Sequence, residues 1–234
     1  MSPSRPAPPP RPGLLVRAVG GLLALPLLAV LGLLLALLLE FAGLTLLWPE
    51  EGAAHGQRRL AAERATLGAF GDTLLGAQPL RLAEQAGAAL TLPLEALRRW
   101  LASPPAPDEW PGLAPLRAGV RPVLTYADAA GTAIQLYALR LTVAVLALPA
   151  FGLFGWVGVV DGLMRRDLRR FGGGPESSFV YHHLKPWLPA LLWLPPAGYV
   201  LLPVSLHPNA VFLPAATLFA LLVAETTARF KKFL

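Results

Sequence analysis

The chain has 234 residues, of which 55% are hydrophobic and only 15% are charged, and its formal net charge is +6. Soluble domains average about 25% charged residues, so this composition excludes an ordinary soluble globule and favours an integral membrane protein. The absence of cysteine excludes disulfides and thiolate metal sites.

The N-terminal part predicts a tail followed by a membrane anchor. Residues 1–17 carry three arginines among six prolines, which predicts a disordered basic tail, with a proline-rich ligand for a partner domain as the alternative. Residues 18–39 contain no charge, and about 20 apolar residues suffice to cross a bilayer. We expect an uncleaved first span over 18–48, because a signal peptide has an apolar region of only roughly 7–15 residues.

Residues 49–131 form the one polar region long enough for a domain. Leu60, Leu67 and Leu74 recur every seven residues, a spacing typical of an amphipathic helix. Pro79 should interrupt this pattern, and two further helices are expected, one before and one after Pro93. The sequence therefore predicts a small helical domain outside the membrane.

The rest of the chain alternates between apolar and basic segments. A long helix is expected to begin near Pro122 and to enter the membrane as the second span. The third span contains four prolines and is expected to be bent or broken. In order, we predict a second span over 132–160, a basic loop over 161–187, a third span over 188–205, a fourth span over 210–227 and a tail over 228–234. The predicted fold class is an all-α membrane protein with four transmembrane helices and a small helical extracytoplasmic domain.

The distribution of charge predicts the orientation of these spans. The two tails and the 161–187 loop, with Glu225 at the end of the fourth span, hold eleven basic and four acidic residues, whereas residues 49–131 hold eight basic and nine acidic ones. Loops rich in lysine and arginine stay in the cytoplasm. We therefore expect a multi-pass membrane protein with both termini in the cytoplasm and residues 49–131 on the outer side, which in a bacterium is the periplasm.

The segment from Asp161 to Lys185 is the most distinctive part of the chain. Its first third has helical spacing of apolar and basic residues, so the second span should continue as an amphipathic helix until the glycines that begin at Gly172. The arginines of this helix fit either a topological signal or a contact surface for anionic headgroups or a partner protein, and the sequence leaves both open. These arginines are Arg165, Arg166, Arg169 and Arg170.

Several catalytic or ligand-binding chemistries are disfavoured. The glycine run near Gly173 lacks the lysine and the preceding strand of a phosphate-binding loop. His182 and His183 are adjacent, so on a helix they diverge by about 100° and do not face one metal ion. Ser177 has no nucleophile-elbow context. We predict no enzyme activity, no cofactor and no metal.

Two ionisable residues lie at the ends of apolar segments. Glu40 follows the first apolar run and Arg140 precedes the second, and each lies about 20 residues from the cytoplasmic end of its span. We hypothesise an ion pair between them; the alternative is that each side chain extends separately to the headgroups.

The stretch DGLMRRDLRRFGGGPESSFVYHH, residues 161–183, resembles the signature of a family of integrating conjugative element membrane proteins, a domain of unknown function. Pro175 departs from the pattern. Such proteins accompany conjugation machinery that resembles type IV secretion. The resemblance implies contact residues at Asp161, Arg166, Arg169, Arg170, Phe171, Ser177, Tyr181 and His182.

The function predicted on this basis is a non-catalytic accessory or scaffold component of a conjugative DNA-transfer apparatus. The partners would be anionic lipid headgroups and other membrane proteins of the apparatus, including the coupling-protein ATPase, with oligomerisation left open. Direct DNA binding is the least favoured contact, because aromatic stacking residues are sparse. The alternative is a small permease or channel subunit.

Overall fold

In a computed structural model, the protein consists of helices joined by turns. The structure describes residues 14–51, 53–69, 78–103, 112, 115, 119–120, 123–172, 181, 183–202 and 204–230. This part of the chain contains no strand, which confirms the all-helical prediction. The helices are α1 (Leu14–Ala42), the π-helix η1 (Gly43–Leu47), α2 (Ala53–Gly68), α3 (Pro79–Ala102), α5 (Val123–Phe171), α7 (Trp187–Leu201) and α8 (Pro208–Ala228).

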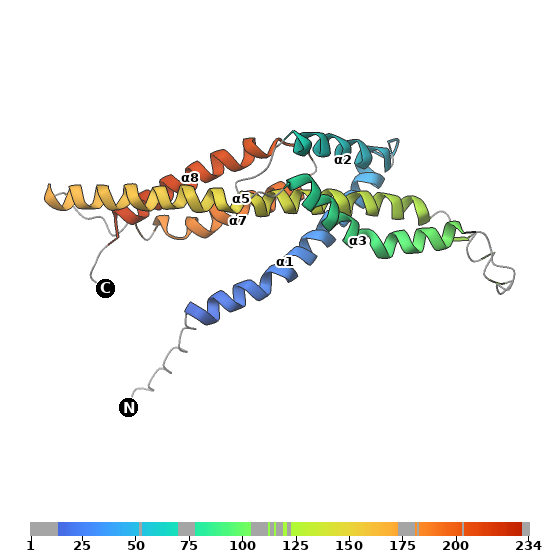
Figure 1. Cartoon of the computed structure of the whole chain (residues 1–234), viewed down its shortest axis with the longest axis horizontal. Helices are drawn as coiled ribbons and strands as arrows, with labels where there is room; N and C mark the ends of the chain where they lie inside the picture. Colours follow the sequence, from blue (N-terminus) through green and yellow to red (C-terminus); the bar gives the residue numbers. More distant parts are fainter. Residues whose placement is uncertain are drawn as a thin grey trace, which may run out of the picture.

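Helix α5 organises the molecule (Figure 1). It has 49 residues, so at 1.5 Å per residue it is about 74 Å long. Helices α7 and α8 lie along the half that ends at Phe171, α2 and α3 lie along the other half, and α1 diverges from the bundle towards its N-terminal end. Each of these five helices contacts α5. The long helix expected to feed the second span is confirmed, and it ends at Phe171, immediately before the glycine run.

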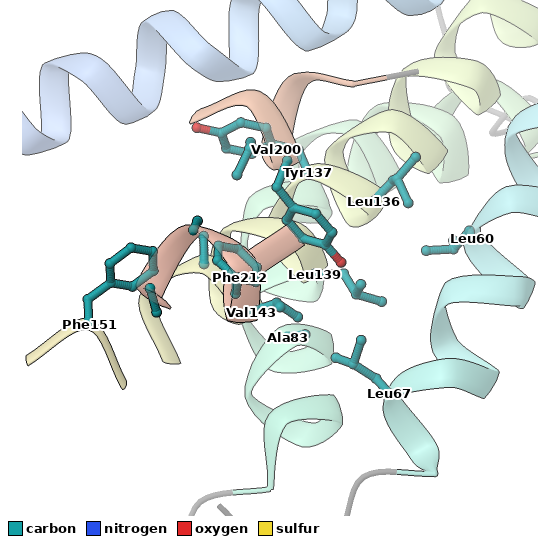
Figure 2. Close-up of a cluster of buried hydrophobic side chains, with 14 residues drawn as sticks. Leu60, Leu67, Ala83, Leu136, Tyr137, Leu139, Val143, Phe151, Val200 and Phe212 are labelled. Carbon is teal, nitrogen blue, oxygen red and sulfur yellow. The ribbon is translucent and has the colours of Figure 1, made fainter. Parts of the chain in front are cut away.

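A cluster of buried apolar side chains from α2, α3, α5, α7 and α8 forms the core (Figure 2). Leu60 and Leu67 of α2 are both buried, as their heptad spacing predicted, while Leu74 lies outside the described residues. Phe151 of α5 is 1% exposed and its ring packs edge-on against Phe219 of α8, with 5.9 Å between the ring centroids. The core therefore joins α2 to the helices that pack on the other half of α5.

Small residues allow α5 and α8 to approach closely. A side chain at Gly158 would collide with the backbone oxygen of Ala220, and a Cβ at Gly162 would lie 2.5 Å from the oxygen of Ala224. Gly158 and Gly162 are four residues apart and therefore lie on one face of α5. Such pairs of glycines allow close packing of apolar helices, where dispersion contacts replace hydrophobic driving force.

Within the described part of the chain, three helical segments are long and apolar enough to cross a membrane, judged by length and composition. They are Pro26–Leu47, Tyr126–Phe171 and Pro208–Ala228. The expected third span at 188–205 corresponds to α7, an apolar helix of only 15 residues. It ends at Leu201 because Leu202 takes an extended backbone conformation, with ψ of 129°.

The expected interruption at Pro93 is wrong. Helix α3 continues through this residue as a single helix of 24 residues. Proline removes one backbone hydrogen bond and disfavours helix interiors, but packing on both sides of Pro93 holds this helix together. Ala83 and Gly87 are buried before it and Leu101 after it, and a Cβ at Gly87 would be only 3.5 Å from the Cα of Gln135 on α5.

Candidate functional site: a buried charge cluster and an arginine face

Arg140 of α5 is the centre of a group of buried charges. Its side chain is 3% exposed, and that of its ion-pair partner, Glu63 of α2, is 6% exposed. Arg140 Nε donates to both carboxylate oxygens of Glu63 at 3.0 Å, and its Nη2 donates to Glu63 Oε1. A guanidinium presents this forked geometry to a carboxylate, whereas an ammonium does not.

The remaining donors of Arg140 are directed at the end of α7. Its Nη1 donates to the carbonyl oxygens of Tyr199, at 3.4 Å, and of Leu202, and its Nη2 donates to that of Val204 at 2.9 Å. The last carbonyls of a helix have no partner within the helix. Arginine has five N–H donors, and here each has an acceptor. One side chain therefore connects α5, α2 and the turn between α7 and α8.

A second ion pair lies beside the first. Arg59 of α2 approaches Glu40 of α1, with 3.7 Å between Nη1 and Oε2, and both side chains are largely buried. Arg59 Nη2 also donates to the oxygen of Leu202 at 3.5 Å. Burial and the neighbouring Arg140 lower the pKa of Arg59. We name Glu40, Arg59, Glu63 and Arg140 the buried charge cluster; with two acids and two bases it is formally neutral.

Glu40 and Arg140 both belong to this cluster, but they do not form the hypothesised ion pair with each other. Both residues line one cavity, but each forms its ion pair with a residue of α2, Glu40 with Arg59 and Arg140 with Glu63. The physical reason is that α2 lies alongside α5 (Figure 1) and places Arg59 next to Glu40 and Glu63 next to Arg140. Sequence reasoning missed Arg59 and Glu63. A signal existed for Glu63, which lies between Leu60 and Leu67 on the apolar face of the predicted helix.

The turn after η1 borders the cluster and is itself ordered by polar contacts. The ring of Trp48 stacks on that of His55, with 4.2 Å between centroids. His55 Nδ1 lies 2.8 Å from Glu51 Oε2, and Arg58 Nη2 lies 2.6 Å from the same oxygen. The hydrogen bond with His55 is the main cause that lowers the pKa of Glu51 below its ordinary value.

The predicted contact residues at the Phe171 end of α5 divide into two groups. Arg165 pairs with Asp161 at 2.8 Å and with Glu225 of α8 at 3.2 Å, so it and Asp161 are used within the chain. In contrast, Arg166, Arg169 and Arg170 form no ion pair with any residue that the structure describes. We name these three side chains the arginine face.

Apolar side chains accompany the arginine face. Phe171 is 92% exposed, and Leu168 and Met164 are exposed as well. Tyr181, another predicted contact residue, packs its ring edge-on against Phe230, with 5.9 Å between centroids. Ser177 and His182 lie outside the described residues. Among the described histidines, aspartates and glutamates, no group of three could hold a metal ion.

Comparison with known proteins identifies the family. No curated protein and no solved structure matches the chain. A family model described as "IncC plasmid conjugative DNA transfer protein DtrJ-like" matches residues 47–231, which include α2 to α8 and the arginine face. This match confirms the resemblance to a conjugation-associated family. Because the match covers most of its length, the chain belongs to the DtrJ-like family.

Proposed function

We propose that the protein is a non-catalytic inner-membrane scaffold of a conjugative DNA-transfer apparatus. Membership of the DtrJ-like family supports a role in conjugative transfer, and the three long apolar helices support a place in a membrane. In this proposal α7 is the short third span, which packs against α8 and α5, and α8 is the fourth. Both termini lie in the cytoplasm and α2 and α3 lie in the periplasm, in accordance with the charge distribution.

The observation that carries the proposal is the arginine face on a projecting helix end, whose three side chains form no ion pair with any described residue. Gly162 of α5 lies opposite Ala224 and Thr227, close to the end of α8 at Ala228. From there α5 continues to Phe171, a distance of about 13 Å at 1.5 Å per residue. Figure 1 shows this end of α5 extending beyond α8.

This projecting end suits a protein partner with an acidic surface. The neighbouring Arg165 and Arg229 already have carboxylate partners. Among the described arginines at this end, those of the arginine face therefore suit charge-assisted hydrogen bonds to a partner, which are roughly twice as strong as neutral ones. Exposed Leu168 and Phe171 add apolar area next to it. An acidic segment of another membrane component of the apparatus would satisfy both features.

The test replaces Arg166, Arg169 and Arg170 together with glutamine and measures conjugation frequency and the amount of protein in the membrane. A matched control replaces Arg58, Arg98 and Arg99 with glutamine, which removes the same charge from the opposite end of the molecule, where Arg58 and Arg98 are exposed. We expect at least a tenfold loss of transfer in the first variant only, with normal membrane levels in both. Wild-type transfer in the first variant would refute the scaffold role of the arginine face.

A further inference from the structure

A small cavity lies beside the buried charge cluster. It has a volume of about 40 Å³ and is lined by residues of α1, α5, α7 and the turn after η1 together with one side chain of α2. Its polar lining consists of Glu40, Trp48, Arg59, Tyr137 and Arg140. The rest of the lining is aliphatic, so the polar atoms in this space are few and identifiable.

Three residues of this lining each carry a buried polar atom that has no hydrogen-bond partner among the described residues. These atoms are Glu40 Oε1, Trp48 Nε1 and Arg59 Nε. Buried polar atoms in folded proteins are almost always paired, so three unsatisfied atoms around one cavity indicate a ligand that the protein itself does not supply. Arg140 and Tyr137 do not compete for it, because the donors of Arg140 are all used and the Tyr137 hydroxyl donates to Ala29 O at 2.7 Å.

The chemistry of the three atoms selects the ligand. Glu40 Oε1 accepts a hydrogen bond, whereas Trp48 Nε1 and Arg59 Nε donate one. A metal cation would be repelled by Arg59 and Arg140, and an anion such as chloride would be repelled by Glu40. Water both accepts and donates, and a cavity holds one water when it offers roughly 10–15 Å³ and two to four polar partners.

We propose that this cavity is an internal hydration site in which one or two ordered waters bridge Glu40, Arg59 and Trp48. Two local features make the space. Gly56 lets the carboxylate of Glu40 approach α2, since a Cβ there would lie 2.8 Å from Oε1. Trp48 folds back over Gly43, at the start of the π-helix. The bridging water completes the contact between α1 and α2, which the 3.7 Å ion pair of Glu40 and Arg59 makes only loosely.

The test is proton NMR of the ¹⁵N-labelled full chain in lipid nanodiscs. The indole signal of Trp48 is assigned by its loss in Trp48→Phe, and its cross-relaxation with water is measured. We expect the cross-relaxation between the Trp48 indole proton and water to have the sign typical of a long-lived bound water. We expect no such signal for Trp156, whose side chain is exposed on α5. Absence of the signal at Trp48 in the wild-type protein would overturn the proposal.

Two further measurements separate water from other occupants. Ala133→Val or Ala36→Val adds two methyl groups to the cavity wall, and we expect the water signal to disappear in whichever variant keeps the wild-type helical content. A signal that persists in both folded variants would place the water elsewhere and reject the site. Replacing chloride by gluconate should leave the Trp48 resonance unchanged, and a shift would indicate an anion instead.

Discussion

Replacing Arg140 should destabilise the protein more than replacing any exposed arginine. Arg140→Met leaves the carboxylate of Glu63 buried without its ion-pair partner and leaves the Val204 oxygen without this donor. Removing one partner of a buried ion pair costs about 3–5 kcal/mol, or roughly a hundredfold to a few thousandfold in the folding equilibrium. Arg58→Met, at a side chain that is 65% exposed in its ion pair with Glu51, should cost about 0–1 kcal/mol.

The assay is reversible unfolding of the purified protein in mixed micelles, followed by far-ultraviolet circular dichroism as the denaturing detergent increases. Glu63→Met and the double variant Arg140→Met/Glu63→Met complete a double-mutant cycle. The double variant should cost clearly less than the two single changes added together, because apolar side chains of similar volume often replace a buried pair at little cost. Equal losses for Arg140→Met and Arg58→Met, or strict additivity in the cycle, would refute the buried cluster as a stabilising connection.

Three further outcomes are expected. Gly158→Leu and Gly162→Leu should separate α5 from α8, because both positions face backbone atoms, whereas Gly152→Leu meets nothing within 4 Å; cross-linking between cysteines introduced into α5 and α8 would fall only in the first two variants. The Glu51 carboxyl should titrate below its ordinary value of 4.5, so its contribution to stability is present above that pH and is lost as the pH falls through the lowered pKa. In His55→Ala, carboxyl NMR should show the pKa of Glu51 moving back up, and an unchanged value would contradict the assigned cause. Tyr137→Phe should cost about 0.5–1.5 kcal/mol by removing the 2.7 Å hydrogen bond to α1 at Ala29 O, and an unaltered unfolding midpoint would show that this bond contributes nothing.

Much of the fold is readable from the sequence, because the relevant signals are local. The apolar run of α1, the start of α5 near Pro122 and its end before the glycines depend on composition and backbone preference along a continuous stretch. The continuity of α3 through Pro93 was not predictable in this way. It depends on the close approach of Gly87 to α5, a tertiary contact that outweighs the local preference of one residue.

The candidate site likewise combines features that local sequence signals predict with features that depend on tertiary contacts. The row of four arginines follows from sequence spacing, although only the structure separates Arg165, which Glu225 engages, from the other three. The partners of Glu40 and Arg140 required knowledge of how α2 folds back on α5. The close packing of α5 on α8 had a local signal in Gly158 and Gly162, which are four residues apart in an apolar segment.

The length of α5 gives the molecule a mechanical property. From Arg140, which is fixed to α2 and the α7–α8 turn, to the solvent-exposed ring of Phe171 the helix runs for about 46 Å at 1.5 Å per residue. Because α8 packs on α5 at Gly158 and Gly162, the two helices turn together in any rotation about Arg140, and a rotation of about 5° displaces Phe171 by about 4 Å over that length. A small angular change near Arg140 is therefore amplified at the far end of α5.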